Sequence, residues 1–546
     1  MANSIEFELR APYNEKAYLL GDFSDEPVEM KKGEDGYFRT KVELADGEHQ
    51  YKFKVQSKSH FLDENAWVEV IDPKATAIDP GAQMAIVRIK NGERILDNYE
   101  WKHDVSDLPT QDQLVIYEML VQDFAQPGED KVNFQSVIAQ LDYIQDLGIN
   151  AIEIMPVQAC PMEIGWGYNC RHYFALRPSY GRPEDLKQLV DECHGRGIEV
   201  ILDMVLNHSE SESPLTQIDF DYWYRREAKD PDNSWGPEFD YEHYDEHYDC
   251  YPAREYMRDM VNFWVSEYHI DGLRFDAVKQ IDNPDFLNWI TDEAGMAAKP
   301  GTCYSIAEHI PEDPSLTGLN RPFDSCWRVS FHYNILDLLT KPGYDIKVVK
   351  ELVDPITQGF GSNTNVINYT TSHDQDHLMS DLGNTQIFGE EAFKRAKLAA
   401  VMVMTALGIP MMWMGEEFGI AGEKSLDPAP LDWALLDNED NNGLLQYYQG
   451  LIRLRKENGA LRSDNLSFFH ENSTDGVIGY IRWDDMGPRV AVVVNCSDNY
   501  LQDYEVSNLP EDGTWHEWTG NYEVQVENGS AKITLSGHEA KVLVWS

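Results

Sequence analysis

The alternation of hydrophobic and polar residues changes character twice along the chain. Up to about residue 98, short alternating stretches are separated by turn sequences such as 34–36 and 45–47. Alternation with a period of two, broken by turns at short intervals, is typical of antiparallel strands in a β-sandwich. We therefore predict an N-terminal β-sandwich over residues 1–98, with strands at 16–20, 36–44 and 49–55.

From residue 99 to 462, apolar runs alternate with stretches of helical periodicity, which indicates βα units around a parallel sheet. Eight consecutive units of this kind predict an α/β fold, a closed (β/α)8 TIM barrel, whose functional residues lie where strands run out into loops. The eight predicted strands are 114–117, 151–156, 197–203, 271–278, 303–308, 327–331, 365–369 and 409–414.

One connection of this barrel, residues 209–251, is too long to be a simple loop. Its length and its content of Asp, Tyr and Trp predict a small loop subdomain or a flap over the barrel mouth. Aromatic rings and carboxylates together suit sugars, which offer apolar faces for stacking and hydroxyls for hydrogen bonds. Internal packing of the loop explains the same aromatic residues equally well.

After residue 462 the pattern returns to strands, at 476–483, 489–494 and 541–545. These strands predict a C-terminal all-β domain, a second β-sandwich, over residues 463–546. The chain is thus expected to divide into three domains.

The charge balance narrows the range of partners. The chain of 546 residues has 45 Lys and Arg against 95 Asp and Glu, a net charge of -50. Such a surface repels phosphate backbones and anionic lipids, so we expect no nucleic-acid or membrane partner and a neutral substrate. The same acidity also serves solubility or growth at high salt.

The seven cysteines show no close pairing of the kind that binds zinc, and they favour free thiols in a reducing compartment. The first residues have neither the basic nor the apolar segment of a signal peptide, and no apolar run reaches 18 residues. We therefore expect a cytoplasmic protein, which we predict to be a monomer.

Polar and charged residues follow several of the predicted barrel strands. A single aspartate close to an arginine, as Asp276 lies close to Arg274, is ordinarily a structural ion pair. Groups at the ends of several strands, however, would all meet at one mouth of the barrel. These groups are Asp203, Asn207 and His208 after the third strand, Arg274 and Asp276 in the fourth, Glu308 after the fifth, and His373 and Asp374 after the seventh.

These four segments resemble the signature regions of the α-amylase superfamily, glycoside hydrolase family thirteen. The resemblance implies that Asp276 is the nucleophile, Glu308 the general acid/base and Asp374 the acid that holds ring hydroxyls. It also implies three contacts to the sugar beside the scissile bond and two supporting residues. The sugar contacts are His208, His373 and the stacking Tyr168 of 165–168; Arg274 orients the nucleophile, and Asp203 supports it.

The N-terminal segment resembles the immunoglobulin-like domain that precedes the barrel in branching, debranching and trehalose-forming enzymes of this family. The resemblance depends on residues 21–23, 46–47 and 51–53. Many such domains have a tryptophan just after the Asp-Phe pair, where this chain has 24–26, Ser-Asp-Glu. We therefore expect this domain to pack against the barrel rather than to bind glucan.

Retaining cleavage of a glycosidic bond needs one carboxylate that attacks the anomeric carbon and one carboxylic acid that protonates the departing oxygen, roughly 5 Å apart. Because Asp276 lies beside Arg274, we expect Asp276 to be the ionised member. We expect Glu308, at the end of an apolar run, to be kept protonated by a less polar setting and acidic neighbours.

Different segments of the sequence resemble different members of the family. Asn207-His208 and residues 277–279 resemble α-amylases, in which Lys279 would lie on the leaving-group side. The N-terminal domain, 372–374 and 408–419 resemble branching and trehalohydrolase enzymes. We predict an α-amylase-type hydrolase of α-1,4-glucosidic bonds in starch, glycogen or maltooligosaccharides, acting through a covalent glycosyl-Asp intermediate. The alternative is a transferase of the glycogen branching type.

A third class, a catalytically silent barrel that serves as a binding partner, would require a lost triad or a membrane anchor, and the sequence shows neither. Asn207 matches a position that often binds calcium in α-amylases, but the remaining ligands have no matching residues. We therefore predict no metal and no cofactor, and an α-glucan as the only partner.

Overall fold

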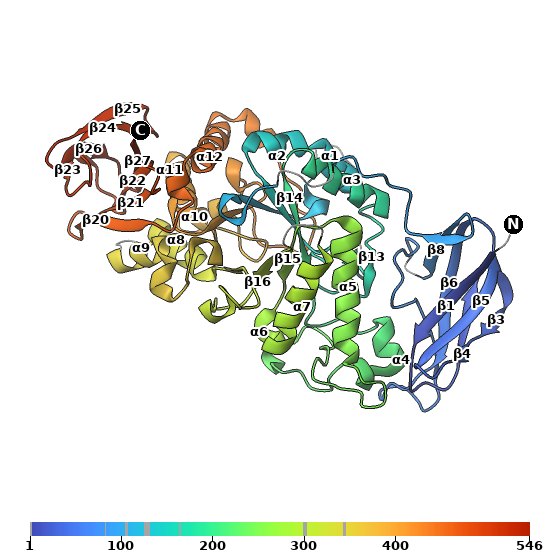
Figure 1. Ribbon diagram of the computed structural model, residues 1–546. Coiled ribbons are helices and arrows are strands. Elements are labelled where there is room, and N and C mark those ends of the chain that lie inside the picture. The colour runs from blue at the N-terminus through green and yellow to red at the C-terminus, as the bar shows by residue number, and fades with distance from the viewer. Residues whose placement is uncertain are drawn as a thin grey trace.

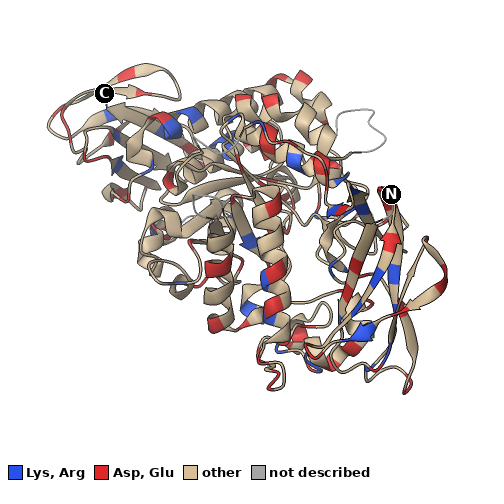
Figure 2. Ribbon diagram, turned by 45° about the vertical axis from the view of Figure 1, so that its right-hand side comes forward, with Lys and Arg blue, Asp and Glu red and all other residues tan. Residues whose placement is uncertain are grey.

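The computed structural model describes residues 3–81, 83–103, 108–124, 132–162, 165–298, 303–341 and 345–545. Figure 1 shows a central barrel with a β-rich domain at each side, the N-terminal one in blue and the C-terminal one in red. Asp and Glu lie along elements of all three parts (Figure 2). No helix in these described ranges is long and apolar enough to cross a membrane.

The N-terminal part forms two antiparallel sheets that face each other. Alternation places Ile5, Phe7 and Leu9 of the first strand in the core between the sheets, against Phe38 and Phe53. One sheet has the order β1 (Asn3–Arg10), β5 (Tyr37–Leu44) and β4 (Lys31–Lys32). The other has β3 (Ser24–Glu29), β2 (Ala17–Gly21), β6 (Gly47–Gln56), β8 (Ala85–Lys90) and β9 (Glu93–Ile95), with β7 (Trp67–Val70) also paired to β6.

Eight parallel strands close the barrel in chain order. They are β10 (Ile116–Met119), β11 (Ala151–Ile154), β14 (Glu199–Met204), β15 (Gly272–Phe275), β16 (Tyr304–Ala307), β17 (Ser325–Trp327), β18 (Val366–Tyr369) and β19 (Ile409–Trp413). The register sets Asp203 of β14 opposite Arg274 of β15. Polar side chains of neighbouring strands therefore meet at one level of the barrel.

The sixth strand differs from its prediction. It ends at Trp327, and residues 329–331 begin the helix α8 (Val329–Thr340). Val329, Phe331, Ile335 and Leu339 of this helix are buried, a spacing that serves a helix rather than a strand. A short apolar run cannot be assigned to helix or strand by periodicity alone.

Helices surround the barrel (Figure 1). Those of two turns or more are α3 (Pro183–His194), α4 (Pro214–Trp223), α5 (Pro252–Tyr268), α7 (Pro284–Ala297), α8, α9 (Ile346–Val353), α11 (Glu390–Thr405) and α12 (Glu439–Glu457). Shorter ones are α1 (Phe134–Ala139), α2 (Leu141–Leu147), α6 (Val278–Ile281) and α10 (Leu378–Asn384).

The long connection 209–251 contains the helix α4 (Pro214–Trp223). Half of its ten Phe, Tyr and Trp side chains are buried, among them Trp223, Tyr224, Phe239 and Tyr241. Tyr241 stacks on Phe286 of α7 with ring centroids 3.6 Å apart. Packing thus explains the buried aromatic residues of this connection, which is one of the two interpretations that the sequence left open.

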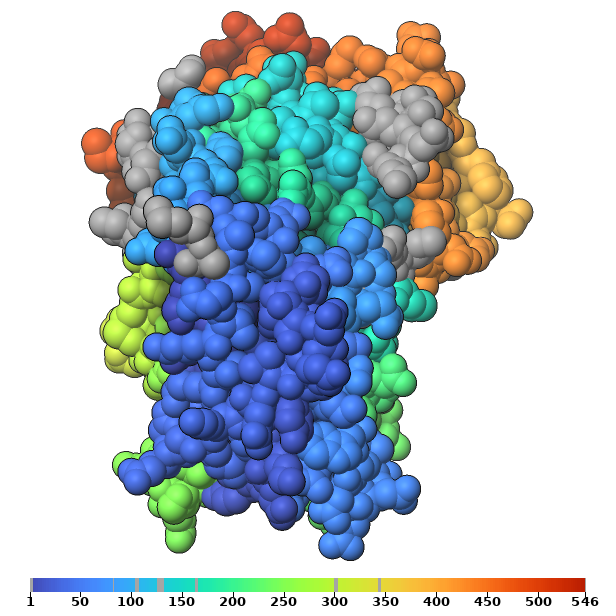
Figure 3. All heavy atoms as spheres, turned by 90° about the vertical axis from the view of Figure 1, so that its right-hand side faces the viewer, coloured from blue at the N-terminus to red at the C-terminus, as the bar shows by residue number. Residues whose placement is uncertain are grey.

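The N-terminal sandwich rests on this connection. Asn14 donates its amide to the carbonyl of Ile218 at 2.9 Å, and the Ser57 hydroxyl donates to the carbonyl of Gln217 at 2.6 Å. A hairpin of β12 (Gln158–Ala159) and β13 (His172–Leu176), which the sequence pattern did not reveal, adds Ala159 and Ala175 to the shared core. Figure 3 views the molecule from the side of the sandwich, whose blue residues lie against the barrel.

The C-terminal part is all-β. One sheet has the order β20 (Leu466–Asn472), β21 (Val477–Trp483), β22 (Arg489–Asn495), β27 (Glu539–Trp545), β24 (Gly513–Glu517) and β25 (Tyr522–Val526), and a second pairs β23 (Leu501–Val506) with β26 (Ala531–Leu535). Arg482 of this domain is buried and donates to the carbonyl of Thr405, at the end of α11, at 2.8 Å. This contact fixes the domain to the barrel.

Candidate active site

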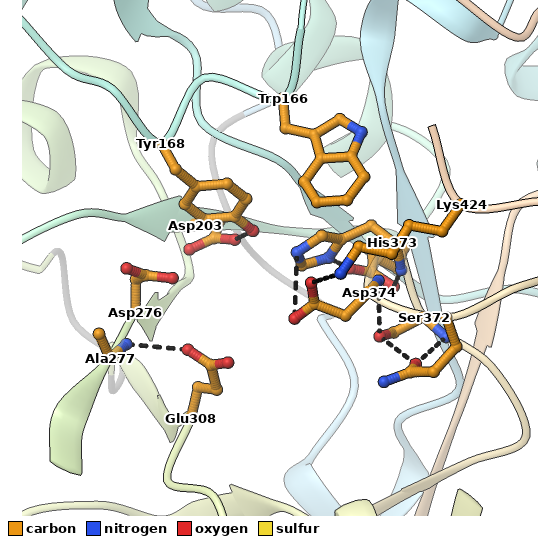
Figure 4. Close-up of polar contacts among 12 residues, drawn as sticks. Trp166, Tyr168, Asp203, Asp276, Ala277, Glu308, Ser372, His373, Asp374 and Lys424 are labelled. Atoms are coloured by element: carbon orange, nitrogen blue, oxygen red, sulfur yellow. Dashed lines mark hydrogen bonds and ion pairs between the residues drawn. The ribbon is translucent and has the colours of Figure 1, made fainter. Parts of the chain in front are cut away.

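A cleft of about 560 Å³ opens where the barrel strands end. It brings together seven of the ten residues named from the sequence, and the other three, Asp203, Asn207 and Arg274, are buried. The seven are Tyr168, His208, Asp276, Lys279, Glu308, His373 and Asp374. Figure 4 shows Asp276 and Glu308 side by side, with His373 and Asp374 facing them across the cleft.

The fully buried Arg274 is the centre of this arrangement. Its Nη1 donates to both oxygens of Asp203, at 2.9 and 3.0 Å, and to Oδ1 of Asp276 at 2.9 Å. Its Nη2 lies 3.2 Å from Oε2 of Glu308. Arginine suits this position because its planar guanidinium stays charged when buried and presents donors in a fixed fork. One cation therefore holds two carboxylates of the cleft in fixed positions.

Asp276 and Glu308 are coupled more tightly than the sequence indicated. Burial raises the pKa of Asp276 well above its usual range, the Glu308 carboxylate raises it further, and Arg274 opposes both. The sequence analysis expected Arg274 to keep Asp276 ionised; Arg274 does favour the charge, whereas burial and the neighbouring Glu308 act against it. Both carboxyls contact the same guanidinium, so the charge of Glu308 acts on Asp276.

Glu308 is also bound by the backbone. The N–H of Ala277 donates to Oε2 of Glu308 at 2.8 Å, and Ala277 has a positive φ of 52°. The left-handed backbone at Ala277 turns the N–H that follows the nucleophile toward the second carboxyl (Figure 4). The chain after β15 thus sets the relative positions of both carboxyl groups.

His373 forms a buried pair with Glu118 of β10, a residue that the sequence analysis did not single out. The Nδ1 of His373 lies 2.6 Å from Oε1 of Glu118, and its backbone N–H donates to Oε2 at 3.2 Å. Burial lowers the pKa of His373, but Glu118 and Asp374 outweigh it and raise the pKa to about 9. Burial raises the pKa of Glu118, and the charge of His373 pulls it down. His373 is therefore a cation at neutral pH.

Asp374 lies between cations. Its Oδ2 is 3.7 Å from Nε2 of His373, and its Oδ1 accepts from Nζ of Lys424 at 2.9 Å. Burial raises the pKa of Asp374, but His373 and Lys424 outweigh it, so the pKa lies below its usual value. Asp374 is thus an ionised acceptor at the wall of the cleft.

Tyr168 and His208 both line the cleft. The hydroxyl of Tyr168 donates to Asp203, and its ring stacks on that of His373 with centroids 5.2 Å apart. Burial lowers the pKa of His208 to about 4, and its Nδ1 has no hydrogen-bond partner among the described residues. His208 is therefore a neutral imidazole, whereas His373 is charged.

The remaining residues named from the sequence lie at the edge of the site or beneath it. The ammonium of Lys279, on α6, donates to the carbonyl of Ile310 at 3.1 Å. Asn207 is buried, and its carbonyl accepts from the N–H of Phe239 in the long connection. Across the described ranges, no group of three or more His, Cys, Asp or Glu is close enough to hold a metal ion.

Four further residues belong to the site. Trp166 and Lys424 line the cleft beside Asp374. Trp235 of the long connection lies beside His208, with ring centroids 5.7 Å apart. The ring centroid of Trp327 lies 4.5 Å from Cζ of Arg274. Trp166 lies within the segment 165–168 that contains Tyr168, so it could have been found from the sequence. Trp235 and Lys424 are in connections without a motif, and only the fold reveals them.

The comparisons with known proteins agree with this architecture. Residues 119–251 match the family described as "Alpha amylase, catalytic domain", and residues 469–546 match "Alpha amylase, C-terminal all-beta domain". The chain is 28% identical to a malto-oligosyltrehalose trehalohydrolase of Saccharolobus solfataricus, over 86% of this chain and 88% of the relative. It is 24% identical to the 1,4-alpha-glucan branching enzyme GlgB of Corynebacterium jeikeium, over 98% of this chain and 78% of the relative.

A solved structure of pullulanase type I from Bacillus subtilis shares the fold with a TM-score of 0.83, at 20% identity, over 100% of this chain and 84% of the pullulanase. The barrel and its cleft of paired carboxyls define an enzyme that acts on glycosidic bonds. The chain belongs to the α-amylase superfamily, glycoside hydrolase family thirteen, and is an α-glucan-active enzyme of that family.

Proposed function

We propose that this enzyme is a retaining glycoside hydrolase that cleaves α-1,4-glucosidic bonds of starch, glycogen or maltooligosaccharides. One observation supports this most directly: a single guanidinium, that of Arg274, contacts both Asp276 and Glu308. The shared guanidinium brings both carboxyls to one point of the cleft. A short separation of about 5 Å is that of retaining enzymes, whereas inverting enzymes keep their carboxyls about 6.5–9.5 Å apart.

In the first step, Asp276 attacks the anomeric carbon while Glu308 gives its proton to the glycosidic oxygen. The bond from the anomeric carbon to this oxygen breaks, its electron pair stays with the oxygen, and the sugar remains as an ester on Asp276. In the second step, the Glu308 carboxylate takes a proton from water, the water oxygen bonds to the anomeric carbon, and Asp276 leaves. The reaction therefore begins with the proton on Glu308 and the negative charge on Asp276.

The other residues of the cleft hold the sugar whose bond is broken. Asp374 accepts hydrogen bonds from hydroxyls of the sugar ring, and Nε2 of the cationic His373 donates a hydrogen bond to the same sugar. Tyr168 presents its ring for stacking, the neutral His208 accepts or donates one hydrogen bond, and Lys279 contacts the leaving group. Asp203 and Asn207 support this set from beneath.

The second candidate is a transferase, in which a sugar hydroxyl replaces water in the second step. The likeness to the GlgB branching enzyme, which extends over 98% of this chain, favours this alternative. The relative with 28% identity is named as a trehalohydrolase and favours hydrolysis. We assign hydrolysis because the Asn207-His208 and Ala277-Val278-Lys279 segments resemble α-amylases.

We further propose that the enzyme acts in the cytoplasm. All seven cysteines are free thiols, six of them buried, as expected for a protein of a reducing compartment.

Incubation with amylose separates the two reactions. Hydrolysis predicts new reducing ends and short maltooligosaccharides. New α-1,6 linkages without a rise in reducing ends would show a transferase instead.

A further inference from the structure

The segment that follows β19 reaches the cleft through Lys424. The ammonium of Lys424 bonds Oδ1 of Asp374 at 2.9 Å, and the two side chains are 44% and 30% exposed, respectively. A partly exposed ion pair of this kind contributes little to stability. Its position beside an active-site carboxylate indicates a role in the reaction instead.

Three contacts fix Lys424 in this place. Its Nζ lies 5.1 Å from the centroid of the Trp166 ring, and the indole N–H of Trp166 donates to the carbonyl of Ser425 at 2.9 Å. The backbone N–H of Lys424 donates to Oδ1 of Asp376 at 2.7 Å. The connections that follow β11, β18 and β19 thus converge on one lysine, and Figure 4 shows its side chain extended over Asp374.

Each oxygen of Asp374 faces a different cation, Oδ1 the ammonium of Lys424 and Oδ2 the imidazole of His373. A carboxylate held at both oxygens cannot rotate freely about its terminal bond, and it still has lone pairs for further hydrogen bonds. Such a carboxylate is ready to accept two hydroxyls of one sugar ring without reorganisation.

We infer that Lys424 is a positioning residue of the proposed glycosidase reaction: it keeps Asp374 ionised and oriented toward the sugar, and Trp166 holds Lys424 in place. The inference rests on the proposed function, because the role of Asp374 is part of it. Besides Lys424, the charged groups that act on Asp374 are His373 and Arg274, and burial opposes all three. Removal of Lys424 takes away one of three cations and the only contact of Oδ1 with a cation in the described part of the chain.

The test compares Lys424→Met with Lys424→Arg. We expect Met, which keeps most of the length but has no charge, to lower kcat by about ten- to a hundredfold with little change in KM. We also expect the acid limb of the kcat profile to move to higher pH, because Asp374 loses a cation that lowers its pKa. Arg keeps the charge and should restore most of kcat and the position of the acid limb.

Lys279→Met is the matched control. It removes the same charge from the same cleft, but the ammonium of Lys279 bonds a backbone carbonyl rather than a carboxylate. We expect this variant to raise KM and to leave the acid limb where it is. If Lys424 only anchored the loop, Lys424→Met would lower Tm and would not move the acid limb of the kcat profile.

Wild-type kcat and an unshifted acid limb in Lys424→Met would overturn the inference, as would equal losses in the Met and Arg variants. A crystal structure of Lys424→Met tests the inference without any activity: we expect the Asp374 carboxyl to turn away from its position beside His373, and an unchanged carboxyl would contradict us. A wild-type enzyme that leaves maltooligosaccharides intact would instead overturn the proposed function.

Discussion

Replacement of Glu118 by Gln removes one negative charge from beneath the cleft and keeps the shape of the side chain. Glu118 lies 2.6 Å from Nδ1 of His373 and is the strongest of the groups that raise the pKa of this histidine. We expect His373 in Glu118→Gln to lose its charge within the neutral range. The enzyme should then become weak at alkaline pH and stay close to wild type at acid pH.

The size of the effect follows from the pKa of His373, which the structure raises to about 9 from the usual value of about 6.5. This shift of about 2.5 units corresponds to roughly 3.4 kcal/mol. At about pH 8 the wild-type imidazole is about nine-tenths protonated, and an imidazole of ordinary pKa is protonated to about 3%. The limit of the loss in kcat/KM at this pH is therefore about thirtyfold.

The sign of the accompanying change in stability is also defined. A histidine whose pKa is raised by folding stabilises the folded state fully below its unfolded pKa, and this contribution disappears as the pH rises through the folded pKa. Wild type should therefore lose stability as the pH rises from about 6.5 to about 9. Glu118→Gln should show a weaker loss over this interval.

The assay is the pH profile of kcat/KM on a maltooligosaccharide, together with NMR of the imidazole nitrogens. Glu153→Gln is the matched control, because Glu153 lies opposite Glu118 on the adjacent strand β11. Burial and then Glu118 raise the pKa of Glu153 well above its usual value, which favours the neutral form that Gln imitates. An unchanged His373 titration in Glu118→Gln, or an equal shift in both variants, would refute the reasoning.

Three further predictions concern other parts of the molecule. Asp276→Asn and Glu308→Gln should abolish turnover of maltooligosaccharides while circular dichroism shows an intact fold, and wild-type-like turnover in either variant would remove the assignment. Trp235→Ala should raise KM about fivefold with little change in kcat, because the 53% exposed ring can stack on a sugar and such stacking contributes roughly 1 kcal/mol to binding. Steady-state kinetics on maltooligosaccharides measure this effect, and an unchanged KM would exclude a substrate contact. Burial raises the pKa of Glu416 to about 7, so its protonated form stabilises the fold at acid pH, and this contribution is lost as the pH rises through about 7. Above that pH, Glu416→Gln should therefore raise the free energy of unfolding by up to about 3 kcal/mol. Equal denaturation midpoints of the two proteins at alkaline pH would contradict this.

The barrel could be predicted because its strands are buried on both faces and therefore appear as continuous apolar runs. The strand ends then define the site, since parallel strands of a barrel place all their carboxyl ends at one mouth. For this reason the charged residues at the strand ends could be grouped from the sequence, whereas their roles, and the choice of Tyr168 and Lys279, came from the resemblance to family thirteen. The cleft brings together Tyr168, Asp276, Glu308 and His373 from four different connections.

Features that depend on closure of the barrel could not be predicted. Glu118 follows a short apolar run, and nothing in that run shows that its side chain reaches a histidine 255 residues away. Lys424 and Asp374 are 50 residues apart and meet only because two loops fold together. The surroundings of Asp276 were only partly visible for a related reason: Arg274 can be read from the sequence, whereas burial and the approach of Glu308, which oppose the charge of Asp276, cannot.

The central claim is that Asp276 carries the sugar during turnover, and trapping of the glycosyl-enzyme tests it most directly. A maltosyl fluoride needs no acid for its first step, so Glu308→Gln should form the ester on Asp276 and then hydrolyse it slowly, because the base that activates water is missing. Mass spectrometry of the quenched and digested protein should find the maltosyl group on the peptide that contains Asp276. A maltosyl group on another residue, or consumption of the fluoride with inversion and no labelled peptide, would contradict the account.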